Sequence, residues 1–163
     1  MPIKRALKGQ YRAALAMLRE TIELCPAETW IAGEHPRNFW RIAYHALHFT
    51  HCYAMPTAED FVPWELHRDC TDLWDDANPP ILEPYTQEQI LDYLSFIDES
   101  ISSWVDRLDL DSQESGFSWY PNLPKLDHQL LNLRHLAGHA GQLSELVMQA
   151  GIHEVRWSTR VPR

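Results

Sequence analysis

Two histidines near the C-terminal end of the chain stand four residues apart, in the segment RHLAGHAGQL. On a helix, side chains at this spacing lie on one face, so His135 and His139 could place two imidazole nitrogens on one metal ion. The spacing alone is a weak signal, because a hydrogen-bonded or surface pair also produces it. Gly138 and Gly141 strengthen it. Each costs a helix about 1 kcal/mol relative to alanine, which a closely approaching helix or room for a ligand would offset.

A third imidazole from a facing helix would complete a metal site. Segment 37–54 is the other donor-rich apolar stretch, and it carries His45, His48 and His51. His45 lies near the centre of one helical face and His48 about 60° away from it. The pattern favours His45 only slightly, and both stay open as the third ligand. A structural, hydrogen-bonded role is the more economical interpretation of His51.

Three neutral imidazoles suit zinc, with nickel, iron, copper and manganese as alternatives. Three protein ligands and an open position are typical of a catalytic metal site rather than a structural one. The open position would receive water or an atom of a small-molecule substrate. His48 and His128 are candidates for a general base, or are hydrogen-bonded structural histidines. Asn132 and Gln142 could orient a ligand by hydrogen bonding to its ring.

The elements that must hold these histidines are helices. Apolar residues recurring at spacings of three and four predict amphipathic helices over 3–24, 86–108 and 126–150, and segment 37–54 is apolar on every side, as a buried helix is. The sequence therefore predicts an all-α, four-helix bundle, and 163 residues argue for a single domain over 1–163.

Residues 55–84 form a long connection between the second and third helices. Five prolines within it exclude one continuous helix. A structureless loop of that length is unusual in a compact domain, so we expect a short helix near 57–70 that covers one end of the bundle. The length also permits the flanking helices to run parallel. Asn38 and Thr86 are the expected N-caps of the helices on either side.

Composition excludes several classes of function. The formal net charge of −9 argues against nucleic acids and anionic membranes as partners. No apolar stretch approaches the ~20 residues of a membrane span, and no signal peptide is evident at the N-terminus, so a cytoplasmic location is expected. Three cysteines without a CxxC pair do not make a disulfide framework. Cys25 and Cys52 are expected to be small buried hydrophobes.

The segments FWRIAYHALHF and LRHLAGHAGQL resemble the two signature regions of the DinB/YfiT-like superfamily of metalloenzymes. The resemblance covers most of the chain, including the tryptophan-containing turn at Glu28–Trp30 and the long second connection. It implies an up-down-down-up four-helix bundle with His45, His135 and His139 as ligands of a divalent metal ion. It also implies a homodimer, and either hydrolase chemistry or transfer to low-molecular-weight thiols.

Two functions from different classes follow. In the first, the protein is a metal-dependent hydrolase or thiol-dependent transferase, in which the ion lowers the pKa of water or of a thiol. In the second, it is a non-catalytic metal- or small-ligand-binding protein of a stress response. The extra histidines and the aromatic-rich connection distinguish this chain from a minimal member of the superfamily. Its substrate therefore cannot be carried over from relatives.

Overall fold

The computed structural model describes residues 2–74, 80–152 and 155–159, and the all-α class is confirmed for them. The helices are α1 (Pro2–Leu24), α2 (Ala27–Ile31), α3 (Phe39–Tyr53), α4 (Gln87–Arg107) and α5 (Lys125–Gln149). The four predicted helices thus begin and end within two residues of their expected bounds. None of the described helices is long and apolar enough to cross a membrane. The sequence also permits a short extended segment over 152–163, which lies partly outside the described residues.

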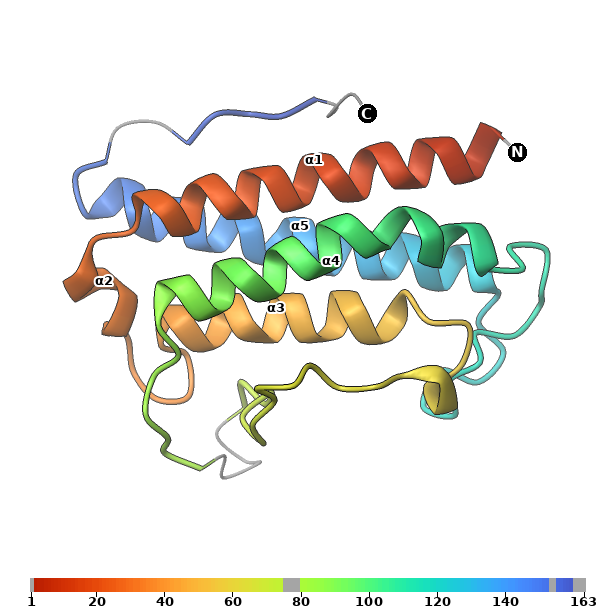
Figure 1. Cartoon of the computed structure of the whole chain (residues 1–163), viewed down its shortest axis with the longest axis horizontal. Helices are drawn as coiled ribbons and strands as arrows, with labels where there is room; N and C mark the ends of the chain where they lie inside the picture. Colours follow the sequence, from red (N-terminus) through yellow and green to blue (C-terminus); the bar gives the residue numbers. More distant parts are fainter. Residues whose placement is uncertain (1, 75–79, 153–154, 160–163) are drawn as a thin grey trace.

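The four long helices lie side by side (Figure 1), and each packs against two neighbours: α1 contacts α4 and α5, and α3 contacts the same two. In Figure 1, α1 and α5 run in one direction and α3 and α4 in the other. α3 and α4 are parallel because the long connection between them crosses back along the molecule. The core is built from apolar stripes, and its fully buried aromatic members include Tyr11, Tyr44 and Tyr93.

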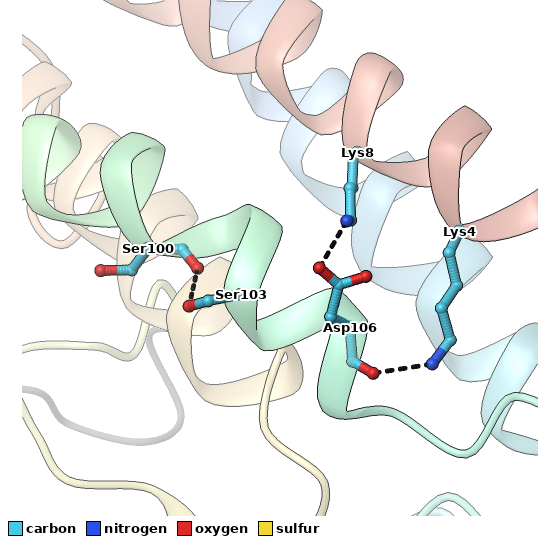
Figure 2. A network of polar contacts seen from close by, with 5 residues as sticks. All are labelled: Lys4, Lys8, Ser100, Ser103 and Asp106. Carbon is cyan, nitrogen blue, oxygen red and sulfur yellow. Dashed lines mark hydrogen bonds and ion pairs between the residues drawn. The ribbon is translucent and has the colours of Figure 1, made fainter. Parts of the chain in front are cut away.

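Lysines in the first two turns of α1 attach it to the end of α4 (Figure 2). The Lys8 ammonium forms an ion pair of 2.6 Å with the Asp106 carboxylate, and Lys4 Nζ donates to the Asp106 backbone carbonyl at 2.8 Å. A cation near a helix C-terminus also interacts favourably with the helix dipole. At the opposite end, the Gln87 amide of α4 donates to the carbonyls of Ile22, in the last turn of α1, and Cys25, just after it. These contacts fix the antiparallel pairing of α1 and α4.

The prediction of a short helix near 57–70 is wrong. Only one turn of 3-10 helix forms, Ala58–Asp60, beneath a capping box in which Thr57 and Asp60 bond each other. Phe61 then turns to extended backbone (φ −78°, ψ 120°). Pro63 disfavours helical backbone at the residue before it and lacks an N–H to continue the ladder. Residues 61–74 and 80–86 of the connection are irregular, and the first of these two segments runs along α3 (Figure 1).

Both N-caps lie at the predicted residues, but only one of them makes the capping hydrogen bond. Thr86 accepts from the Gln89 backbone N–H and completes a capping box at the start of α4. Asn38 precedes α3, but its side chain makes no capping bond. Its amide instead donates to the Gly33 carbonyl at 2.7 Å, which closes the turn between α2 and α3.

All three cysteines are buried and free of disulfide bonds. The expectation for Cys25 and Cys52 is therefore confirmed, and Cys70 joins them at the edge of the core. Burial raises the pKa of Cys25 and Cys52 to about 12 and that of Cys70 to about 11. Thiols with such pKa values are poor nucleophiles at neutral pH.

Candidate metal centre

Three histidines from two helices meet where α3 packs against α5. The side chains of His45, His135 and His139 each offer a ring nitrogen, and these atoms all lie within 4.8 Å of one another. His45 Nε2 and His135 Nε2 are 2.9 Å apart. Each pair of rings has centroids 4.6–4.9 Å apart. The group could hold a divalent metal ion, and it contains His45 rather than His48.

Two amides on α5 set the register that brings these histidines together. Gln129 donates to the carbonyl of Tyr53 at 2.7 Å, and Asn132 donates to the carbonyl of Thr50 at 3.1 Å. Both side chains are fully buried, and both carbonyls belong to the last turn of α3. The Thr50 carbonyl also accepts from the backbone N–H of Ala54 at 3.2 Å. Because α3 and α5 are antiparallel, the next turn of α5 reaches back to His45. Asn132 thus acts through helix register and not, as expected, on a ligand ring.

His45 is held by a backbone carbonyl of the long connection. Its Nδ1 lies 2.6 Å from the carbonyl oxygen of Thr71. A carbonyl can only accept, so Nδ1 carries the proton and Nε2 presents a lone pair to the centre of the group. This is the arrangement in which an imidazole is oriented for metal binding by a partner on its other nitrogen.

His139 is oriented in the same way by its own helix. Its Nδ1 lies 3.0 Å from Oε1 of Gln142, one turn further along α5, so Nε2 is again the free nitrogen. The expected orienting role of Gln142 is therefore present. His135 differs, because its Nδ1 is buried without a hydrogen-bond partner among the described residues. Its Nε2 faces the lone pair of His45, a contact that requires either a proton or a cation between the two nitrogens.

A ladder of three side-chain donors, two on α3 and one just before it, holds the irregular segment that carries Thr71 in place. Arg37 Nε donates to the Leu73 carbonyl at 3.2 Å, Arg41 Nε to that of Asp72 at 3.2 Å, and His45 to that of Thr71. Arg41 and His45 stand four residues apart, so they project from one side of α3, and Arg37 lies two residues before the helix begins. The sequence analysis did not predict this ladder, although Arg37, Arg41 and His45 stand four residues apart in the sequence.

Burial keeps the imidazoles of the group neutral. Desolvation lowers the pKa of His45 to about 3 and that of His135 to about 4, and it lowers the pKa of His139 as well. Neighbouring imidazoles lower the pKa of His45 further. At pH 7 the three lone pairs are therefore available without the release of a ring proton to solvent.

The other candidate histidines lie outside the group. His48 packs among Tyr44, Phe49, Phe61 and His67, and His67 stacks on it with ring centroids 5.2 Å apart. Its role as a general base stays a prediction.

His128 is fully buried, with the rings of Tyr53, Phe117 and Tyr120 around it. It stands seven residues before His135, or about 10 Å along the helix, so direct contact with a reactant at the group is not supported. His51 bonds Tyr93, as its structural interpretation requires.

The two glycines of α5 are not sites of close helix approach. A Cβ placed on Gly138 or Gly141 would meet no described side chain, and no backbone beyond its own helix, within 4 Å. Both glycines are exposed to solvent. Of the two expectations that would offset their helical cost, close approach of a helix is therefore wrong, and room for a ligand stays a prediction.

Gln142→Leu removes the acceptor that orients His139. We expect zinc affinity to fall about tenfold, within the range found for partners of metal-bound histidines. Competition with a chromophoric chelator measures the dissociation constant. Gln149→Leu, on the same helix and bonded only to Glu145 among the described residues, should leave it unchanged. Equal affinities for the two variants would contradict the orienting role.

Acid should destabilise the fold through histidines away from the metal centre. Burial lowers the pKa of His51 and of His128 from 6.5 to about 4. Between these values the unfolded chain takes up protons that the folded protein does not. The free energy of unfolding therefore falls as the pH falls, by about 1–2 kcal/mol per histidine from pH 7 to pH 5.

Urea unfolding at the two pH values tests this directly. His128→Phe should reduce the pH dependence by its share. A pH dependence that is the same in His128→Phe and wild type would exclude His128 as a source.

Comparison with known proteins finds no relative: no family model matches the chain, and no curated protein or solved structure matches it either. The function is therefore argued from the geometry of the three histidines.

Proposed function

We propose that the protein is a metal-dependent enzyme whose divalent ion is held by His45, His135 and His139. The observation that carries the proposal is the convergence of three neutral imidazoles, two of which have their outer nitrogen engaged by an acceptor. Three nitrogen ligands favour zinc or nickel, with iron and manganese as alternatives. No fourth protein ligand belongs to the group among the described residues, as expected of a catalytic site rather than a structural one.

A divalent ion in such a site supplies Lewis acidity, which activates water or a thiol near neutral pH. The chain's own residues prepare it. Thr71 and Gln142 fix the tautomers of two ligands, and the surrounding core keeps protons off all three imidazoles. The open space at Gly138, the residue before His139, leaves room for a small-molecule substrate. These features support hydrolysis or a thiol-dependent transfer.

The helix directions and the two histidine segments support placing the chain in the DinB/YfiT-like superfamily, as an up-down-down-up four-helix bundle. In that case a homodimer is expected in solution, and sedimentation velocity of untagged protein measures it. A monomer at all concentrations would remove the homodimer from the proposal and leave the metal centre untouched.

Activity screening of zinc-loaded and chelator-treated protein tests the proposed function. Panels of esters, amides and thiol acceptors, the last with and without added thiol, separate hydrolysis from transfer. We expect turnover that requires both zinc and the intact histidine group, and that is absent from His139→Ala. Silence across every panel with zinc bound would contradict catalysis and favour a non-catalytic protein that binds a metal or small ligand in a stress response.

A further inference from the structure

A cavity lies between α4 and the segment that follows α3, away from the three histidines. Its volume is about 590 Å³, within the usual range for small-molecule sites. It is lined by residues 51–65 of α3 and the connection, and by one face of α4. His51 lines it, and His45 six residues earlier points about 120° away around the helix. None of the three grouped histidines lines this cavity.

The aromatic wall of this cavity is already assembled. Its members are His51, Trp64, Phe96 and Trp104. Tyr93, which is fully buried and not part of the lining, stacks on Trp64 with ring centroids 4.5 Å apart and an interplanar angle of 6°. The rings of His51 and Trp104 are stacked at 4.7 Å and 11°. The Tyr93 hydroxyl and His51 Nδ1, 3.0 Å apart, hydrogen-bond the two stacks to each other, and Phe96 packs edge-on against Trp104. Such a wall loses little side-chain freedom when a flat ligand binds.

The charged lining is predominantly acidic. Asp60, Glu65 and Asp92 line the cavity, and Arg107 is its one cationic side chain. Asp60 is engaged by Thr57 in the capping box. Among the described residues, no hydrogen bond or ion pair engages the side chains of Glu65 and Asp92. Both the carboxylates and the aromatic faces attract a cation.

We propose that this cavity binds a small organic cation, namely an ammonium group carried on a flat apolar body. The ammonium would lie toward Glu65 and Asp92, and the apolar body would pack against Trp64 and Phe96. The volume accommodates one such molecule and its hydrating waters. The site is independent of the proposed metal chemistry, because it shares no residue with the histidine group.

Titration of the full-length protein with three matched compounds tests the proposal. Phenethylammonium carries the positive charge, 2-phenylethanol replaces it with a neutral hydroxyl, and 3-phenylpropionate carries a negative charge on the same ring. We expect phenethylammonium to bind about tenfold more tightly than the other two, with an affinity that falls as salt rises. Equal affinity for all three, or no binding of phenethylammonium at millimolar concentration, would overturn it.

Charge-neutral variants locate the site. The double variant Glu65→Gln, Asp92→Asn should bind phenethylammonium about five- to tenfold more weakly. Asp98→Asn removes a carboxylate from the same helix but outside this cavity, and should bind like wild type. His139→Ala should also retain wild-type binding, so failure of the metal centre would not affect this result. Wild-type affinity for phenethylammonium in the double variant would overturn the assignment. Loss of binding in Asp98→Asn or in His139→Ala would overturn it as well.

Discussion

Replacing His139 with alanine should raise the dissociation constant for zinc by more than about a hundredfold. The variant loses one of three nitrogen ligands, and such a loss exceeds the tenfold to hundredfold effect of removing a partner of a ligand. A hundredfold change corresponds to about 2.7 kcal/mol of binding free energy. Chelator competition on untagged protein measures it, and far-ultraviolet circular dichroism verifies that the helices persist. His139 is only partly buried, so we expect the fold to survive.

His48→Gln is the matched control for this prediction. His48 lies on the same helix as His45, three residues away. The sequence analysis left the two histidines as alternatives for the third ligand. The structure places it among aromatic rings outside the group. Zinc affinity in this variant should match wild type. Tight zinc binding by His139→Ala, combined with loss in His48→Gln, would show that the ion is held elsewhere.

Replacing Arg41 with methionine should lower both stability and zinc affinity. Arg41 is fully buried, and its guanidinium donates to the carbonyls of Asp72 and Pro80 at 3.2 and 2.9 Å. Methionine keeps the apolar stem but leaves these carbonyls without their charged donor, which costs about 2–3 kcal/mol of unfolding free energy. Loosening of the adjacent Thr71 carbonyl should weaken zinc binding about tenfold, because His45 loses its fixed orientation. Urea unfolding and chelator competition measure the two effects.

Arg37→Met is the control for Arg41→Met. It shows whether the loss of stability comes from the buried guanidinium or would follow the loss of any arginine that bonds this segment. Arg37 donates to the neighbouring carbonyl of Leu73, but it is exposed to solvent. Its replacement should therefore cost well under 1 kcal/mol. A larger loss of stability in Arg37→Met than in Arg41→Met would contradict the role assigned to the buried guanidinium.

The helices could be predicted from the sequence because their signals are local. Apolar spacing, Pro26, Gly151 and the Thr86 capping box act within a few residues of the ends that they define. The connection could not be predicted in the same way. The Thr57–Asp60 capping box resembles a helix start, yet Pro63 ends the turn at once, and the path beyond it depends on which groups of α3 it can bond.

The histidines of the candidate site could be predicted from the sequence, but the groups that position them could not. The spacing of His135 and His139 indicated a ligand pair from local helix geometry alone. The choice between His45 and His48 required the register of α5 on α3, which Gln129 and Asn132 set by bonding the end of α3. The Thr71 carbonyl is a backbone group in an irregular segment, and no pattern of side chains in the sequence predicts its position.

An anomalous difference map at the zinc edge, from crystals of untagged protein grown with zinc, would show directly where the ion binds. We expect one strong peak per chain, about 2.0–2.1 Å from a ring nitrogen of each of His45, His135 and His139. A map with no peak between α3 and α5, or with its strongest peak at other side chains, would contradict it.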